Sequence, residues 1–126
     1  MTNSVMANAL RGAAVTLSLT ACAASAEQTS NGSGAVLRAL DKTSGATVDL
    51  SIGTGQIGTI GRLKIVLAEC RYPKGNPSGD AYAALEISET GHAGTVFTGW
   101  MIASAPALNP MEHQRYDIWV MRCSTS

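Results

Sequence analysis

Four carboxylates in the second half of the chain are the side chains best suited to acid–base chemistry: Asp80, Glu86, Glu112 and Asp117. A glycoside hydrolase needs two carboxyl groups that face each other across a cleft, roughly 5–10 Å apart. Apolar neighbours flank Glu86 and would raise its pKa if it were buried, but strand alternation favours an outward position for it. The four residues are candidates for a small glycan hydrolase, and the sequence pairs no two of them.

Three residues, Glu112, His113 and Asp117, lie close enough in the sequence to suggest a catalytic triad. Nucleophilic hydrolysis also needs an activated nucleophile, and the chain has no G-x-S-x-G turn of the kind that presents a serine. A loop histidine held by a neighbouring carboxylate is the more common arrangement. We therefore predict no catalytic residues and keep the hydrolase as an alternative.

A glycine pattern at residues 53–58 (GTGQIG) matches the G-x-G-x-x-G of dinucleotide-binding sites. Such a site needs a helix directly after the glycines, because the helix amides bind the pyrophosphate. A β-type stretch follows here, so we predict turns and no cofactor. His92 and His113 have no metal-ligand spacing, and no C-x-x-C pair accompanies them, so we also predict no metal site.

Two loops are the stretches where we expect ligand contacts, because loops carry most binding residues. Residues 72–80 contain two prolines and two glycines, and residues 103–115 include Pro106 and Pro110. Within the first loop, Tyr72 is the best candidate for an exposed contact. The residues predicted to contact a ligand are Tyr72, Asp80, His113 and Tyr116.

The elements that must position these side chains are β-strands throughout. Apolar and polar residues alternate with a period of two, and Gly, Pro, Asn and Asp separate the runs. Residues 81–88 also contain good helix formers, but a helix of that length would be marginal. Trp100 and Trp119 alternate with apolar partners, so we expect both in the core. The expected strands are 35–40, 46–52, 62–71, 81–88, 95–103 and 116–123. Six to seven short strands predict an all-β fold, a small antiparallel sandwich or barrel, in one domain over residues 35–126.

The first 26 residues read as an export signal with two alternative processing sites. Arg11 precedes a short apolar run, and residues 19–22 (LTAC) look like a bacterial lipobox, so we predict a signal over 1–22 and lipidation of Cys22. The alternative is ordinary cleavage after residue 26. Residues 23–34 are rich in Ser, Gly and Asn and are predicted to be a flexible linker. We therefore expect an exported, periplasmic protein, anchored to the outer membrane if Cys22 carries lipid.

The charge of the chain argues against several kinds of partner. The 126 residues have a formal net charge of zero, and the export segment contains one charged residue, Arg11. The domain therefore has no basic surface for nucleic acid. The apolar run of the signal is shorter than the roughly 20 residues of a membrane-spanning helix. We expect membrane contact only through a lipid anchor.

Two cysteines, Cys70 and Cys123, remain as a pair once Cys22 is lipidated or cleaved off. In an oxidising compartment such a pair is expected to form a disulfide, the alternative being two buried thiols. Closing a loop of about 50 residues would contribute on the order of 4 kcal/mol in the chain-entropy model.

A series of short motifs in the second half gives the chain a family resemblance. They are, in order, residues 70–73 (CRYP), 76–77 (NP), 79–81 (GDA), 97–101 (FTGWM), 104–108 (SAPAL), 112–113 (EH), 116–120 (YDIWV) and Cys123. Together they resemble the domain of unknown function 2155 family, small exported proteins of Gram-negative bacteria, over residues 35–123. The resemblance implies an exported domain with no established activity. Some members carry a cellulase-like label, but no catalytic motif here matches it, and no functional residue is carried over.

From these observations we expect a non-catalytic module of the cell envelope that binds an envelope protein or a glycan. The first alternative is the small glycan hydrolase with paired carboxylates. The second is a structural subunit of an envelope complex, which would expose an apolar patch of several hundred Å².

Overall fold

The computed structural model describes Gly12, Ala14, Thr16, Leu17 and residues 27–125. The predicted signal cleavage sites and Cys22 lie outside the described residues. Within the described part of the chain, no helix is long and apolar enough to cross a membrane. The eight strands are β1 (Thr29–Asn31), β2 (Gly34–Asp41), β3 (Thr47–Gly53), β4 (Ile57–Ile60), β5 (Leu63–Pro73), β6 (Tyr82–Glu89), β7 (Thr95–Ile102) and β8 (Tyr116–Ser124).

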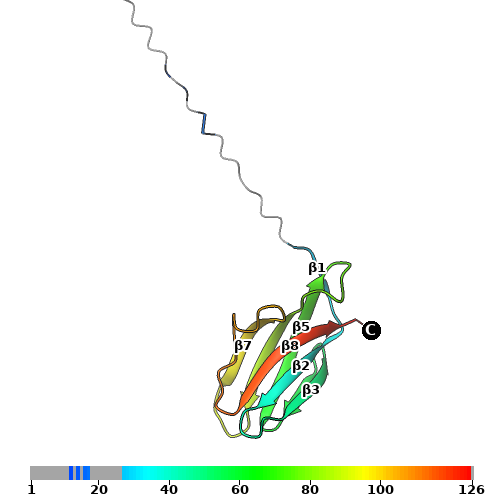
Figure 1. Cartoon of the computed structure of the whole chain (residues 1–126), viewed down its shortest axis with the longest axis vertical. Helices are drawn as coiled ribbons and strands as arrows, with labels where there is room; N and C mark the ends of the chain where they lie inside the picture. The colour runs from blue at the N-terminus through cyan, green and yellow to red at the C-terminus, as the bar shows by residue number, and fades with distance from the viewer. Residues whose placement is uncertain (1–11, 13, 15, 18–26, 126) are drawn as a thin grey trace, which may run out of the picture.

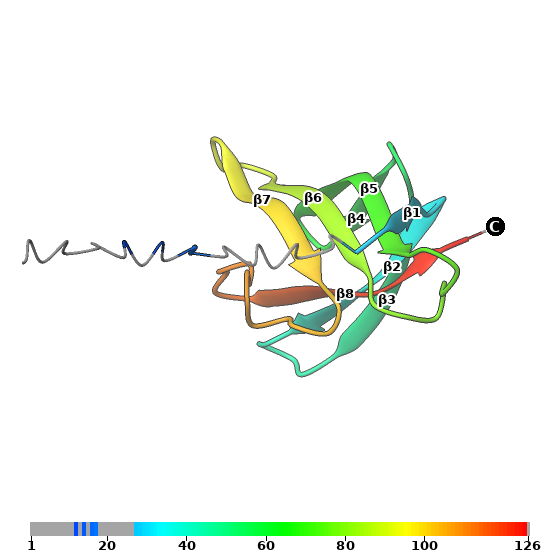
Figure 2. The same ribbon diagram turned by 90° about the horizontal axis from the view of Figure 1, so that it is seen from above.

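The strands form two antiparallel sheets that face each other (Figures 1 and 2). The large sheet has the order β1-β5-β6-β7, and β4 pairs with β5 as well. Because β6 pairs along most of β5, β1 and β4 share the opposite edge of β5. The small sheet has the order β3-β2-β8. The all-β prediction is confirmed, and the architecture is a sandwich rather than a barrel.

Two of the eight strands, β1 and β4, are absent from the six ranges that the sequence predicts. β1 lies inside residues 23–34, so the predicted flexible linker is wrong from Thr29 onward, where the backbone pairs with β5. β4 lies within the glycine-rich stretch after β3. A Cβ at Gly58 would lie 2.7 Å from Leu50 Cδ2, so the glycine lets β4 approach the side chains of β3.

The chain crosses from the large sheet to the small sheet at Gly32 and Ser33. The Gly32 amide donates to the Cys70 carbonyl on β5 at 2.6 Å, and the Ser33 amide donates to the Ser124 carbonyl at 2.8 Å. A Cβ at Gly32 would lie 2.8 Å from the Ser124 carbonyl oxygen. This crossing therefore requires a residue without a side chain.

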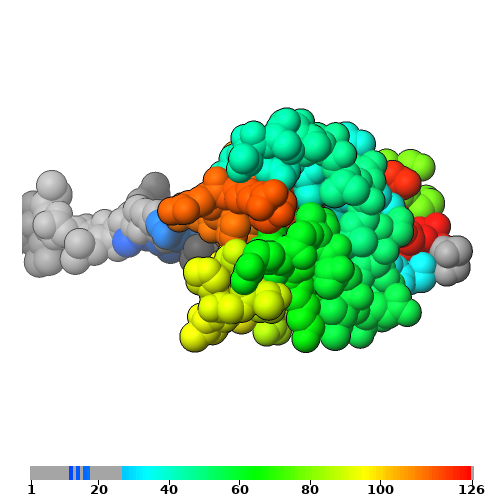
Figure 3. Space-filling model, turned by 90° about the horizontal axis from the view of Figure 1, so that it is seen from below, coloured from blue at the N-terminus to red at the C-terminus, as the bar shows by residue number. Residues whose placement is uncertain are grey.

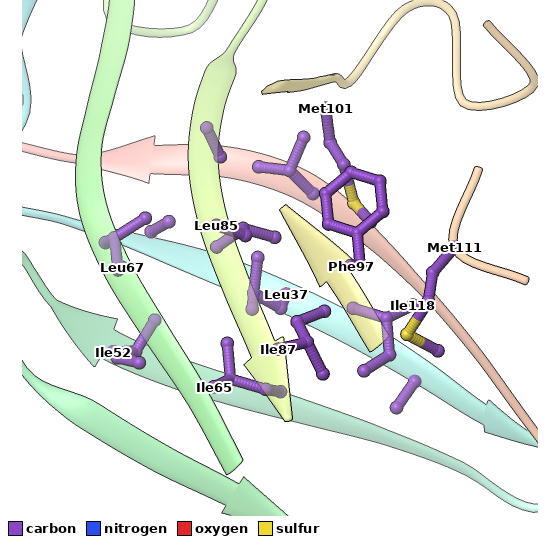
Figure 4. Packing of buried hydrophobic residues seen from close by; sticks show 14 of the residues in the cluster. Leu37, Ile52, Ile65, Leu67, Leu85, Ile87, Phe97, Met101, Met111 and Ile118 are labelled. Carbon is purple, nitrogen blue, oxygen red and sulfur yellow. The ribbon is translucent and has the colours of Figure 1, made fainter. Parts of the chain in front are cut away.

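The core lies between the sheets and is built by the alternating inward residues of both. Leu37, Ile65, Leu67 and Ile87 are buried in its centre, and Phe97, Met101 and Met111 extend it toward β7 and the following loop (Figure 4). No polar or charged residue of the described chain is buried in it. Strand alternation thus governs which side chains face inward on β6 and β7, and on β5 a register shift between Leu67 and Glu69 brings Cys70 to the same inner face as Leu63, Ile65 and Leu67.

A disulfide joins Cys70 on β5 to Cys123 on β8, with a Cα–Cα distance of 5.7 Å. It links the two sheets at the corner where the chain crosses at Gly32. The predicted pairing is confirmed.

Candidate functional site

The four carboxylates proposed for acid–base chemistry do not converge. Glu86 lies between the buried Leu85 and Ile87 and points outward from the large sheet. Asp117 points outward from the small sheet, with its Oδ1 3.6 Å from Lys42 Nζ. These two carboxylates therefore lie on opposite outer faces of the sandwich. The pairing that a glycoside hydrolase needs is not present between them.

Asp80 lies ahead of β6, at the end of that strand opposite Glu89. Its carboxylate accepts hydrogen bonds from the Ala81 amide at 2.9 Å, from the Ser104 amide at 2.9 Å and from the Ser104 hydroxyl. Burial raises the pKa of Asp80, but these hydrogen bonds outweigh it and the pKa lies below its usual value. Asp80 ties the loop after β7 to the start of β6.

A hollow of about 770 Å³ lies at the other end of the sandwich. Figure 3 looks onto this end, where the loop before β8 (orange) meets the turn between β6 and β7 (yellow). We call it the His113 hollow. Its lining residues are Arg62, Glu89, His92, Val96, Glu112, His113, Gln114, Arg115 and Tyr116.

Both ring nitrogens of His113 are engaged. Nδ1 accepts hydrogen bonds from the backbone amides of Arg115 at 3.0 Å and Tyr116 at 3.1 Å, and Nε2 lies 3.1 Å from Glu89 Oε2. Because two amides donate to Nδ1, the neutral ring carries its proton on Nε2 and donates it to Glu89. His113 therefore fixes the turn before β8 and has no free nitrogen with which to accept a substrate proton.

Glu89 is the centre of this arrangement and was missed by the sequence analysis. Its side chain is 16% exposed, and Oε2 also lies 3.6 Å from His92 Nε2. The hydrogen bond from His113 holds the pKa of Glu89 below its usual value, and the charges of His92, His113 and Arg62 act in the same direction against burial. Glu89 and His113 are 24 residues apart, so no local pattern in the sequence links them.

Tyr116 forms a wall of the hollow, with its ring centroid 5.6 Å from that of His113 and Arg115 Cζ 5.2 Å from its ring. Arg115 is paired with Asp41 at 3.1 Å, and this hydrogen bond lowers the pKa of Asp41. Gly61, with φ at +55°, leaves room for the Tyr116 hydroxyl, which a Cβ there would overlap. The aromatic ring is therefore held in place from both sides.

The predicted contact residues divide between the two ends of the molecule. His113 and Tyr116 meet in the hollow, and Glu112 is exposed at its rim. Tyr72 does not lie in a loop as expected: it belongs to β5, pairs with Ser30 of β1 and packs against the core. It and Asp80 lie at the far end, so the four residues do not form one site.

The outer face of the large sheet carries a second candidate site that the sequence analysis missed. Trp100 was expected in the core, but its neighbours Phe97 and Met101 point inward and Trp100 points outward, 41% exposed. Trp119 also faces outward, half-buried on the small sheet. A hollow of about 510 Å³ lies beside Trp100. Its lining residues are Glu27, Thr29, Arg71, Tyr82, Trp100 and Ile102.

Metal ligands do not cluster in the part of the chain that the structure describes. Over Gly12, Ala14, Thr16, Leu17 and residues 27–125, no group of three or more His, Cys, Asp or Glu side chains is placed to hold a metal ion. The glycines of residues 53–58 form the end of β3, a turn and part of β4, without the helix that a dinucleotide site needs.

Comparison with known proteins gives a match to one family model, over residues 35–123. No curated protein and no solved structure matches the chain. The matched region runs from the start of β2 to the disulfide cysteine of β8 and thus includes the His113 hollow and Trp100. The chain belongs to the family described as an uncharacterized protein conserved in bacteria, DUF2155.

Proposed function

We propose that this protein is an exported, non-catalytic module of the cell envelope that binds a partner protein in the His113 hollow. The observation that carries the proposal is the double engagement of His113, whose two ring nitrogens bond the Arg115 and Tyr116 amides and Glu89. A general base needs a nitrogen within reach of a substrate proton. His113 instead uses both ring nitrogens to hold one wall of the hollow in place.

The lining of the hollow suits a polypeptide. Arg62 and the exposed His92 and Glu112 offer both signs of charge at its rim, and Val96 and Tyr116 offer apolar surface inside. Protein surfaces present the same mixture, and a preformed hollow reduces the entropy lost on binding. The export signal in the first 26 residues supports a partner in the periplasm or the outer membrane.

Site-specific photocrosslinking in the producing bacterium tests the proposal. A benzoylphenylalanine at Gln114, an exposed residue of the hollow, is expected to give one reproducible crosslinked protein. The matched control places the same probe at Ser51, exposed on β3 of the small sheet. The substitution Glu112→Lys, which reverses a charge at the rim, should weaken the Gln114 crosslink several-fold.

Two results would overturn the proposal. Identical crosslinks from Gln114 and Ser51, or none from either, would remove the hollow as the binding site. Release of sugars from peptidoglycan or polysaccharide by the purified protein would show that the module is an enzyme.

A further inference from the structure

We infer that the outer face of the large sheet is a glycan-binding surface on which Trp100 stacks against a neutral sugar ring. This site lies away from the His113 hollow and does not depend on the function proposed for it. The name Trp100 face is used below for Glu69, Arg71, Tyr82, Ala84, Trp100 and Ile102.

Strand register aligns these residues in two rows. Glu69, Ala84 and Trp100 stand opposite one another on β5, β6 and β7, and Arg71, Tyr82 and Ile102 form the adjacent row. Ala84 is the residue directly beside Trp100 on β6, and its single methyl group leaves the indole uncovered on that side. An exposed tryptophan beside a small residue offers a flat apolar surface of the size of a sugar ring.

Polar groups that can bond to sugar hydroxyls flank this surface. Arg71 Nε donates to Glu69 Oε1 at 3.0 Å, and the Tyr82 hydroxyl donates to Glu27 Oε2 at 3.0 Å. Each pair retains further donors and acceptors, since a guanidinium has five N–H groups and a carboxylate has about four acceptor sites. An apolar plate with a few fixed polar groups is the usual composition of a small-ligand site.

The charges of the face favour a neutral ligand. Glu27, Glu69 and Glu86 lie on it or at its border, against Arg71, which is already paired with Glu69. Anionic lipid and nucleic acid would be repelled by this surplus of carboxylates. Glucose-type sugars present C–H groups on their ring faces and hydroxyls at their edges, which matches an aromatic plate bordered by carboxylates and an arginine.

The backbone of Trp100 is held by hydrogen bonds on both sides of β7. Its carbonyl oxygen accepts a hydrogen bond from Asn109 Nδ2 at 3.0 Å, so the loop after β7 covers the open edge of that strand. β7 is also paired along its length with β6. A backbone that is already ordered adds little to the conformational entropy lost on binding.

Fluorescence titration of the full chain tests the inference. The chain has two tryptophans, so Trp119→Phe leaves Trp100 as the only tryptophan reporter. The probes are the β-1,4-linked hexamers of N-acetylglucosamine and of glucose. We expect a saturable change in Trp100 emission with at least one hexamer, and calorimetry should show at least tenfold weaker binding for Trp100→Ala.

The matched control is Trp119→Ala on the opposite outer face, which should bind as the unmodified chain does. Circular dichroism and thermal unfolding establish that each variant is folded. The inference is overturned if neither hexamer gives saturable binding, or if Trp100→Ala binds as tightly as Trp119→Ala. It is also overturned if Trp100 responds only to lipid vesicles, or only to a second copy of the chain as measured by sedimentation.

Discussion

The His113 hollow and the Trp100 face lie toward opposite ends of β6, and they differ in the side chain that each leaves exposed to a ligand. In the hollow, His113 is engaged with Glu89 and with the backbone, and Arg115 is paired with Asp41, which lies outside the lining. On the Trp100 face the largest side chain is exposed, and its indole makes no hydrogen bond to any residue that the structure describes. The difference teaches that polar residues clustered in a hollow can act mainly to stabilise the fold. An aromatic ring exposed on the outer face of a sheet can be the stronger indication of a ligand-binding site.

The comparison predicts that substitutions in the two regions lower the free energy of unfolding by different amounts. The largest loss is expected at the disulfide, which lies outside both regions. Replacing both Cys70 and Cys123 by serine should lower the free energy of unfolding by about 4 kcal/mol, because the loop they close becomes unrestrained in the unfolded chain. Urea denaturation measures the loss. The matched control is Cys22→Ser, which should leave the denaturation midpoint unchanged. An equal loss in both proteins would contradict the assigned role of the disulfide.

At the hollow, Gly61→Ala should cost roughly 2 kcal/mol, because the new methyl overlaps the Tyr116 hydroxyl and the backbone has a positive φ. Gly45→Ala is the matched control, since φ there is +75° and nothing lies within 4 Å of its Cβ position. The extra loss at Gly61, measured by thermal unfolding, isolates the contact with Tyr116. Equal losses would mean that Tyr116 is not held against Gly61.

The hydrogen-bonded Glu89 carboxylate of the hollow makes stability depend on pH. The pKa of Glu89 is lowered in the folded protein from an ordinary value of 4.5, so its stabilising contribution is complete above that value. The contribution is lost as the pH falls through the lower folded-state pKa. Glu89→Gln should flatten this part of the stability profile, whereas Glu86→Gln on the outer face should not. Unfolding midpoints measured between pH 2 and 7 test this prediction. Identical profiles for both variants would show that Glu89 does not cause the pH dependence of stability.

At the Trp100 face, Trp100→Ala should change the free energy of unfolding by less than about 1 kcal/mol, because the ring is 41% exposed and points away from the core. Its neighbour on the inner face, Met101, should cost 2 kcal/mol or more when replaced by alanine, since it is buried. Chemical denaturation of the two variants measures the difference. A large loss for Trp100→Ala would mean that the ring supports the fold and is not kept for a ligand.

The fold could be predicted because it depends on alternation within single strands. The period-two pattern of β3, the apolar residues on both faces of β5 and the β-branched and aromatic residues of β7 identify strands directly. The predicted export signal, by removing Cys22 from the domain, leaves two cysteines to pair, and these two form the disulfide. The short strands β1 and β4 were not predicted, because they pair with β5 through backbone hydrogen bonds. The sequences of these glycine-rich and serine-rich segments do not indicate such pairing.

The sites could be predicted less well, because they depend on pairs that are distant in the sequence. His113 was identified from its loop and Tyr116 at the start of the strand that follows, but Glu89 enters the same hollow from the end of β6. Trp100 was assigned to the core because a tryptophan among apolar residues fits either face of a strand. Only the positions of Phe97 and Met101 relative to the second sheet decide which face is buried.

The corner formed by Gly32, Cys70 and Cys123 has a mechanical consequence. A pull on the chain ahead of Thr29 reaches first the hydrogen bonds of β1 to β5, then the Gly32 and Ser33 amides bonded to β5 and to Ser124. The disulfide joins β5 to β8 at this corner. The force is therefore carried by a covalent bond between the two sheets before it acts on the core. A domain tethered through its N-terminus would thus transmit tension across both sheets instead of peeling one from the other.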